Sequence, residues 1–249
     1  MSGGARNAKR RQQAEREARL AAAGIRVPQS KADKNRVPMI AAGIVIALVV
    51  VVAGGWYWFS TRPVTPTFTA TASGAVVTAG TGPVVIDVYE DFLCPGCLAL
   101  EKRDGNKIIT ALNDGKLTVK YHMLGLLDAR TKPAGYSTRA ADASLCAAAA
   151  GIYGAYHQKL FNVQPAENSA GLTDDQLVSY GTDLGAGADF AACVKGTKND
   201  AAIKKETDAA TSAAGLKNQG VFGTPTVAKD GKRIDINASG WLDTVLAGK

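Results

Sequence analysis

The chain has 249 residues, of which 46% are hydrophobic, so it is long enough for one globular domain with appended segments. Its net charge of +7 lies in the N-terminal segment, because residues 1–36 hold ten of the 29 basic residues and three of the 22 acidic ones. The remainder is neutral, which excludes a folded nucleic-acid-binding surface built on positive charge.

The basic segment 1–36 is predicted to be a solvated tail on the cytoplasmic side of a membrane. Its Ala, Arg and Gln residues favour a short helix over residues 8–23, and Pro28 prevents a longer one. A nucleic-acid-binding arm is the alternative interpretation of such a run of charge.

Residues 37–61 carry no charge and are predicted to form one transmembrane helix that anchors the chain in the lipid bilayer. As a helix, the apolar run 39–59 would be about 31 Å long, which matches the hydrocarbon core. The basic tail precedes this run and aromatic residues 56–58 end it, so the N-terminus is expected in the cytoplasm and the C-terminal domain outside the cell membrane. A cleaved signal peptide is the alternative, although its apolar run is usually only about 7–15 residues long.

A linker rich in Thr, Pro and Gly is predicted over residues 62–82, with a short edge strand at 75–78. The globular domain, 83–249, follows it. The first elements expected there are a strand at 84–89, a helix from Cys94 to about Asn113 and an alternating strand at 117–123. Strand, helix and strand in this order form a βαβ unit with a parallel pair.

A block without strands is predicted over residues 128–216, so a helical domain would be inserted into the α/β domain. Its expected helices cover residues 140–161, 173–184, 189–195 and 199–214. The β pattern then resumes at 221–228 and 233–236, and the Asp230-Gly231 pair between these runs is typical of a hairpin. A final helix at 241–247 is expected to pack on the sheet.

Four cysteines in a domain outside the membrane predict disulfides. Cys94 and Cys97 are three positions apart at the start of a helix, a spacing that allows a disulfide to close and open without backbone movement. This leaves Cys146 with Cys193 as a structural bridge, which would stabilise the fold by about 4 kcal/mol. A second redox centre, or a zinc ion held by all four cysteines, is the alternative interpretation.

Thiol–disulfide exchange needs a thiolate, and a helix N-terminus favours one through its unpaired N–H groups and its dipole. Cys94 is therefore predicted to be the exchanging sulfur and Cys97 the buried resolving thiol. Pro95 suits the first helical turn. Pro225 follows Thr224 at the start of a late strand, where proline is unusual unless its peptide bond is cis.

These features resemble the thioredoxin superfamily and, within it, the DsbA-like branch, which combines a Cys-Pro-x-Cys helix, a helical insertion and a cis-proline loop beside the nucleophile. The similarity covers about residues 83–248, and the segments that carry it are YEDFLCPGC at 89–97, YHQKLF at 156–161, GLT at 171–173, FAAC at 190–193 and GVFGTPT at 220–226. A membrane anchor with a second disulfide resembles the actinobacterial members. The resemblance implies a thioredoxin-like α/β fold, oxidative folding of exported cysteine-containing proteins, and reoxidation by a quinone-linked membrane partner of the DsbB or the vitamin-K-epoxide-reductase-like type.

Two positions depart from that branch. Gly96 stands where its best-known oxidants have histidine, and Val88 stands where the superfamily tends to have a buried carboxylate beneath the second cysteine. Glu90 lies on the same strand face as Val88, and we hypothesise that Glu90, or a water, relays the proton of Cys97. The missing histidine leaves the direction of the reaction, oxidation or reduction, open.

The domain contains two histidines, His122 on the strand face opposite the apolar residues and His157 in the insertion. Each is predicted to be a hydrogen-bonded structural histidine. A catalytic Cys/His dyad is the alternative.

The predicted function is that of a membrane-tethered thiol:disulfide oxidoreductase that donates the Cys94–Cys97 disulfide to exported proteins. A thiol reductase or disulfide isomerase with the same pair is one alternative, and a non-catalytic envelope scaffold or binding module is another. The residues expected to carry the catalysis are Cys94, Cys97, Thr224, Pro225 and Glu90. No cofactor or metal is expected, and a monomer is expected because no apolar stripe is left over.

Overall fold

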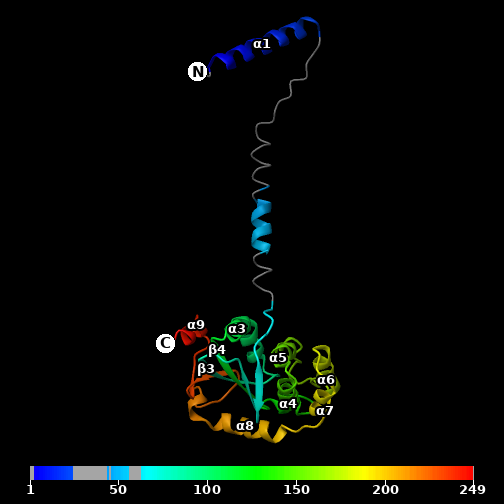
Figure 1. Ribbon diagram of the computed structural model, residues 1–249, viewed down its shortest axis with the longest axis vertical. Helices are drawn as coiled ribbons and strands as arrows, with labels where there is room; N and C mark the ends of the chain where they lie inside the picture. The colour runs from blue at the N-terminus through cyan, green and yellow to red at the C-terminus, as the bar shows by residue number, and fades with distance from the viewer. Residues whose placement is uncertain (1–2, 25–43, 45, 56–62, 249) are drawn as a thin grey trace. The chain divides into compact units, whose positions relative to one another are not determined.

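The computed structural model describes residues 3–24, 44, 46–55 and 63–248 (Figure 1). The chain divides into two compact units, residues 1–62 and 63–249. In the first unit, α1 (Gly3–Ala22) is a helix, and its side chains at residues 6–22 are exposed. It is longer than the helix predicted at 8–23, because the Ala, Arg, Gln and Glu residues that fill it are strong helix formers.

The transmembrane helix predicted at 37–61 lies mostly outside the described residues. Residues 46–55 are helical, and apolar side chains there, such as Leu48 and Val51, are 59% and 69% exposed. No helix within the described ranges is both long and apolar enough to cross a bilayer. The span therefore stays a prediction.

The second unit is built on a six-stranded sheet with the order β1-β2-β4-β3-β5-β6. Its strands are β1 (Ala70–Ser73), β2 (Val76–Ala79), β3 (Val84–Glu90), β4 (Leu117–Met123), β5 (Thr226–Lys229) and β6 (Lys232–Arg233). β3 and β4 run parallel, and the other neighbouring pairs are antiparallel. Because α3 (Pro95–Asn113) joins the parallel pair, the predicted βαβ unit is confirmed.

A helical insertion separates β4 from β5, as the sequence predicts for residues 128–216. Its elements are the 3-10 turn η1 (Asp128–Arg130), the helices α4 (Tyr136–Ala149), α5 (Tyr153–Asn162), α6 (Asp174–Asp183), α7 (Ala188–Lys195) and α8 (Asp200–Ser212), and the 3-10 turn η2 (Ala214–Leu216). Figure 1 shows α4 to α7 gathered on one side of the unit, with α9 (Trp241–Leu246) beside α3. The indole of Trp241 donates to Asp104 on α3, which fixes that last helix.

Alternation along β3 and β4 puts an apolar layer on one face of the sheet. Ile86 and Val88 on β3, with Val119 and Tyr121 on β4, are at most 3% exposed. α5 packs on this face through Tyr153, whose ring lies 5.6 Å from that of Tyr121. The same face carries α3, so the start of α3 is anchored on the main core.

Residues 63–82 belong to the folded unit, although their composition predicts a linker with one short edge strand. They contain the β1–β2 hairpin, and β2 pairs with β4 so that Val77 lies opposite Tyr121. The physical reason is the alternation of Ala75, Val77 and Ala79, which are at most 3% exposed and extend the apolar layer by one strand.

Three predicted elements differ in their bounds. The single helix predicted at 140–161 is two helices, α4 and α5, because Gly151 takes a φ of +73° after the end of α4. The strand predicted at 221–228 begins only at Thr226, since Pro225 has no N–H to offer the ladder. The strand predicted at 233–236 is shortened to Lys232–Arg233.

Candidate active site

The two thiols lie where β3 ends and α3 begins. Cys94 immediately precedes the first turn of α3, with φ and ψ of −72° and 117°, and Pro95 starts the helix. The N–H groups of Cys97 and Leu98 both donate to the carbonyl oxygen of Cys94, at 3.1 and 3.2 Å. Both thiols are free and buried. The sulfur of Cys94 is thus held at the positive end of the helix dipole, as predicted.

The loop before β5 reaches Cys94 across 130 positions of sequence. The Cys94 sulfur lies 3.2 Å from the carbonyl oxygen of Thr224 and, as a thiol, donates to it. The Thr224–Pro225 peptide bond is cis, which confirms the prediction made from the position of Pro225. The loop therefore presents its backbone beside the exchanging sulfur.

Gly96 faces this loop at close range. A Cβ on residue 96 would lie 3.0 Å from Cδ of Pro225 and 3.4 Å from the carbonyl oxygen of Thr224. A larger residue would need the loop or the helix to shift by a few tenths of an ångström. The glycine that departs from the DsbA-like branch therefore lets the start of α3 approach the cis-proline loop closely.

The two thiols differ in pKa because their electrostatic surroundings differ. The pKa of Cys94 is lowered to about 6, above all by a hydrogen bond from the Cys97 thiol. The Thr224 side chain and the backbone N–H groups of Cys97 and Gly96 lower it further, and burial opposes them. Burial above all, and then the nearby sulfur of Cys94 and the charge of Glu90, raise the pKa of Cys97 well above its ordinary value. Cys94 is therefore the thiolate at neutral pH and Cys97 the protonated thiol.

Glu90 lies on β3, on the sheet face that carries α3, and is 1% exposed. Its charge contributes to the raised pKa of Cys97. Its Oε1 atom is hydrogen-bonded to Nε2 of His157, whereas its Oε2 atom is buried and has no hydrogen-bond partner among the described residues. The strand-face argument thus placed this carboxylate correctly, and its charge acts on the resolving thiol.

A third ionisable group, Glu101 on α3, joins this pair. One oxygen or nitrogen from each of Glu90, Glu101 and His157 lies within 4.8 Å of the others, and two carboxylates with an imidazole could share protons or hold a divalent cation. The sequence predicted a hydrogen-bonded His157 but neither its partner nor Glu101, because the packing of α5 against α3 brings them together.

Asp91, which sequence reasoning missed, fixes the turn that follows β3. It is fully buried, and its carboxylate accepts hydrogen bonds from the N–H groups of Leu93 at 2.8 Å and Leu127 at 2.9 Å. Burial raises the pKa of this carboxyl group to about 7, against the opposing effect of these hydrogen bonds. An aspartate that bonds the N–H two residues on is a common turn signal, and it could have pointed to this residue.

Gln164, just after α5, holds the same turn from the side of the insertion. Its Nε2 donates to the carbonyl oxygens of Phe92 and Cys94, at 3.0 and 3.1 Å. No local pattern marks Gln164, because its partners lie about seventy positions away in the sequence. The helical insertion therefore contributes directly to the position of the reactive turn.

His122 lies on the other face of the sheet. Its Nδ1 is 2.6 Å from Oε1 of Glu206 on α8, and its Nε2 is 3.0 Å from Oδ1 of Asp87. Its ring stacks on that of Tyr89, with centroids 4.0 Å apart. The prediction of a hydrogen-bonded structural histidine is confirmed, and this residue is separated from the thiols by the sheet.

Cys146 on α4 and Cys193 on α7 form a disulfide with a Cα separation of 5.9 Å, as predicted from the cysteine spacing. Both residues belong to the helical insertion. The bridge therefore uses two of the four cysteines and leaves Cys94 and Cys97 as the pair available for exchange.

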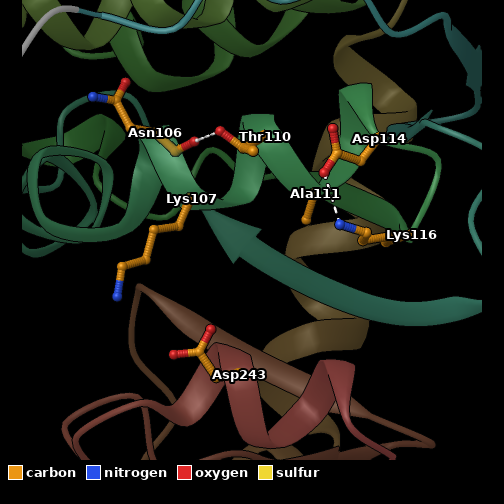
Figure 2. A pocket seen from close by; sticks show the side chains of 7 residues that line it. All are labelled: Asn106, Lys107, Thr110, Ala111, Asp114, Lys116 and Asp243. Carbon is orange, nitrogen blue, oxygen red and sulfur yellow. Dashed lines mark hydrogen bonds and ion pairs between the residues drawn. The ribbon is translucent and has the colours of Figure 1, made fainter. Parts of the chain in front are cut away.

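An open pocket, lined mostly by residues with polar or charged side chains, lies along the C-terminal half of α3 (Figure 2). Its lining residues are Asn106, Lys107, Thr110, Ala111, Asp114, Lys116 and Asp243. Asp114 and Lys116 form an ion pair at 2.8 Å across one end of it. At about 1.5 Å per residue, Thr110 is roughly 20 Å along the helix from the thiols, so this pocket is not part of the exchange site.

The thioredoxin family matches residues 73–245 of the chain. A sequence relative is the serine/threonine-protein kinase PknE of Mycobacterium tuberculosis, which is 31% identical over 180 residues. The matched region covers 70% of this chain and 31% of the kinase, so the chain spans about a third of the length of the curated relatives it matches.

Solved structures share the fold. MdbA, a thiol-disulfide oxidoreductase from Corynebacterium diphtheriae, matches with a TM-score of 0.63 at 23% identity, over 75% of this chain and 97% of that one. The reduced form of the disulfide bond oxidoreductase DsbG from Mycobacterium tuberculosis matches with a TM-score of 0.56 at 25% identity, over 76% and 89%. Oxidised DsbA of the same organism matches with a TM-score of 0.53 at 25% identity, over 73% and 98%. The fold is that of DsbA-like proteins, and the chain belongs to the thioredoxin family.

Proposed function

We propose that the chain is an extracytoplasmic thiol:disulfide oxidoreductase that donates the Cys94–Cys97 disulfide to exported proteins during their oxidative folding. The observation that carries the proposal is the difference in pKa between the two thiols. Cys94 has a pKa lowered to about 6 beside the cis-proline loop, and Cys97 is a buried thiol with a raised pKa one turn behind it. A structural disulfide needs no such difference, whereas exchange does.

The exchange conserves atoms and electrons as follows. A substrate thiolate attacks the Cys94 sulfur, the bond between Cys94 and Cys97 breaks, and Cys97 leaves as a thiolate that takes up a proton. A second substrate thiolate then attacks the substrate sulfur of the mixed disulfide and releases Cys94 as a thiolate. Two electrons have passed from the substrate dithiol to the pair. The low pKa of Cys94 favours this step, because a weakly basic thiolate leaves readily.

Thr224 and Pro225 have the role of holding the substrate near Cys94. As the Cys94 sulfur already contacts the Thr224 carbonyl oxygen, a peptide joined to that sulfur would lie against the same loop. Glu90 has the role of exchanging the proton of Cys97. With a glutamine at residue 90, we expect slower exchange at neutral pH, and a normal rate in Glu90→Gln would remove this role.

The direction of exchange is tested by the redox potential. The purified chain is equilibrated with glutathione buffers, and the midpoint of the Cys94–Cys97 couple is read by alkylation of the reduced thiols. A midpoint near about −120 mV supports donation of the disulfide, and one near about −270 mV, the value of a typical thioredoxin, overturns it.

A reductase or isomerase with the same pair is the second candidate. The absence of histidine at residue 96, where the best-known oxidants of the DsbA-like branch have one, favours it. An isomerase rearranges a scrambled disulfide protein without net oxidant, so refolding of such a protein by the reduced chain would support this candidate over donation.

The membrane anchor at 37–61 and the outward orientation are part of the proposal. The exposed apolar side chains of residues 46–55 and the basic tail ahead of them favour it. Retention of the chain in membranes after alkaline extraction, with the thiols accessible only from outside the cell, is the expected result. The partner that reoxidises the pair, by accepting its two electrons, is then a quinone-linked membrane protein. Exported cysteine-containing proteins are the substrates.

A non-catalytic envelope scaffold is the alternative from another class. The two are separated by a Cys97→Ala variant, which cannot resolve mixed disulfides and should accumulate them with exported proteins. Their absence in cells that express the variant, with Cys94 still reactive toward alkylating reagents, would favour the scaffold.

A further inference from the structure

Three ionisable side chains from three elements meet on the α3 side of the sheet, close to the resolving thiol. They are Glu90 from β3, Glu101 from α3 and His157 from α5, and one polar atom of each lies within 4.8 Å of the others. One bridging water can span that separation. Glu90 and His157 are 1% and 4% exposed, whereas Glu101 is only partly buried as a residue.

The imidazole of His157 is enclosed by aromatic rings. The ring centroids of Phe92, Tyr121, Tyr153 and Phe161 lie 4.9 to 5.6 Å from its own. Such walls keep bulk water away, so the hydrogen bond between His157 and Oε1 of Glu90 forms in a medium of low dielectric constant. His157 therefore fixes the orientation of the Glu90 carboxylate and leaves its Oε2 atom without a hydrogen bond to any residue that the structure describes.

The position of Glu101 depends on a glycine one turn further along α3. A Cβ on Gly105 would lie 2.9 Å from Oε2 of Glu101. Glycine inside a helix is unfavourable, and here its missing side chain leaves the space that the Glu101 carboxylate occupies. The helix thus leaves room for a carboxylate beside the buried pair.

The ionisable groups that face this cluster are Cys97 and Asp104 on α3, Tyr121 on β4 and Tyr153 on α5. Burial first, and then the charges of Glu90 and Asp104, raise the pKa of Glu101 to about 7, while His157 opposes them. Burial lowers the pKa of His157, but the charges of Glu90 and Glu101 outweigh it and raise that pKa. The cluster can therefore release or take up a proton near neutral pH.

We propose that Glu90, His157 and Glu101 form a buried proton-exchange group for Cys97, with Glu101 as its connection to solvent. When Cys97 leaves a disulfide as a thiolate, its sulfur receives a proton through Oε2 of Glu90, directly or by one water, and Glu101 takes one proton from solvent. When Cys97 attacks a mixed disulfide, the same transfer runs in reverse, and no electrons pass through the group. The inference rests on the proposed exchange function. Glu90 would take the place of the buried carboxylate that the superfamily tends to have at the position of Val88. His157 and Glu101 are positioning residues, since neither touches the reacting sulfur.

The test uses the purified full-length chain, reduced and mixed with saturating oxidised glutathione in a stopped-flow instrument. The first-order phase then reports the attack of Cys97 on the mixed disulfide at Cys94. In the wild-type chain, we expect its rate to rise about tenfold per pH unit up to about pH 7 and then to level off, because the group has lost its proton there. In His157→Gln, we expect a rate at least about tenfold lower at pH 7 that rises steadily with pH, without levelling.

Two further variants keep the result clear if His157→Gln folds poorly. Glu101→Gln changes a half-buried residue and should remove the levelling near pH 7, and Gly105→Ala should do the same by displacing the Glu101 carboxylate. His122→Gln is the matched control, since it replaces the other carboxylate-bonded histidine on the far face of the sheet, and should keep the wild-type pH profile. The proposal would be overturned if His157→Gln, Glu101→Gln and Gly105→Ala all kept the wild-type pH profile. It would also be overturned if their rates were lower at every pH and still levelled off near pH 7.

Two controls distinguish proton exchange from metal binding and from a chain that does not exchange disulfides. Zinc bound to the wild-type chain at one equivalent and lost in His157→Gln would assign the three side chains to a metal site and overturn proton exchange. If the wild-type chain itself forms no Cys94–Cys97 disulfide with glutathione at any pH, the proposed oxidoreductase function fails. If it does, and only the pH profiles are unchanged among the variants, the exchange function stands and the proton-exchange group alone is rejected.

Discussion

The thiolate of Cys94 depends most on its neighbour in the motif, because a hydrogen bond from Cys97 is the largest cause of its lowered pKa. Cys97→Ala removes that donor, so we expect the pKa of Cys94 to rise from about 6 toward its ordinary value of 9.0. Cys97→Ser keeps a hydroxyl donor and should raise it less. The ultraviolet absorbance of the thiolate, followed against pH, measures both values, and equal midpoints in the two variants would contradict this assignment.

Asp91 makes a second single-residue prediction. In Asp91→Asn, one of the two acceptors becomes an NH₂ group that faces the backbone N–H of Leu93 or Leu127, so a buried donor is left unpaired. We expect the free energy of unfolding in urea to fall by about 1–3 kcal/mol. Asp235→Asn is the control, because that exposed carboxylate also accepts from the N–H two residues on, and we expect a change within about 0.5 kcal/mol.

Residue patterns explain why part of the site could be predicted. The spacing of Cys94 and Cys97 and the unusual strand position of Pro225 are local signals, and strand parity placed Glu90 on the correct face. The partner of Glu90 could not be predicted in this way, since His157 is 67 positions distant and meets it only when α5 packs on the sheet.

At the scale of elements, His122 joins the sheet to the insertion through Asp87 on β3 and Glu206 on α8. Burial would lower the pKa of His122, but the hydrogen bonds and charges of Asp87 and Glu206 outweigh it, so the pKa is raised. A histidine with a raised pKa contributes stability below its unfolded value of about 6.5, and this is lost as the pH rises through the folded value.

We therefore expect the amide-exchange protection of α8 to decrease as the pH rises above about 6.5, after correction for the intrinsic exchange rate. In His122→Gln, the protection should be lower and independent of pH in this range. α6, which supplies no partner to His122, serves as the internal reference. A pH-independent α8 in the wild-type chain would show that the imidazole does not carry this contact in its charged form.

The insertion has a covalent tie of its own between α4 and α7. The Cys146–Cys193 disulfide closes a loop with a sequence separation of 47, so replacing both cysteines with alanine should lower the free energy of unfolding by about 4 kcal/mol. Urea denaturation under non-reducing conditions measures the loss. The pKa of Cys94 is the control and should stay at about 6, because neither cysteine contacts the reactive turn. A lowered free energy together with a shifted pKa would show that the bridge also shapes the site.

Over the whole molecule, the site draws on three parts of the folded unit that are distant in sequence. The βαβ unit supplies the thiols, the loop before β5 supplies the cis-proline, and the insertion supplies His157 and Gln164. Sequence patterns predicted the first two parts and the helical character of the third. They predicted the short strand at 75–78, which is found as β2, but not β1, which pairs with β2 and takes the edge of the sheet. The residues of β1 are mostly exposed and carry no hydrophobic alternation.

The redox state of the pair should set how the stability of the whole fold depends on pH. In the reduced chain, Cys94 has a pKa of about 6 when folded and 9.0 as its ordinary value, so between these pH values the unfolded chain binds one proton more than the folded one. Stability then rises with pH by about 1.4 kcal/mol per unit, is fully present above pH 9, and is lost as the pH falls through 6. Cys97 keeps its proton in the folded chain across this window, because its folded pKa lies well above 9.0. In the unfolded chain it loses that proton from about pH 9 upward and then lowers the stability.

In the oxidised chain, neither sulfur titrates, so the difference in unfolding free energy between reduced and oxidised chains removes the contribution of His122 and, below about pH 8, is dominated by that of Cys94. We expect this difference to increase by up to about 4 kcal/mol from pH 6 to pH 9, measured by urea denaturation of both forms. Cys94→Ser carries no thiolate and should lose the slope. Equal slopes in the two redox forms would mean that the thiolate of Cys94 is no more stable in the folded chain than in the unfolded one. Cys94 would then not stabilise the reduced pair, and it could not be the residue that drives disulfide donation.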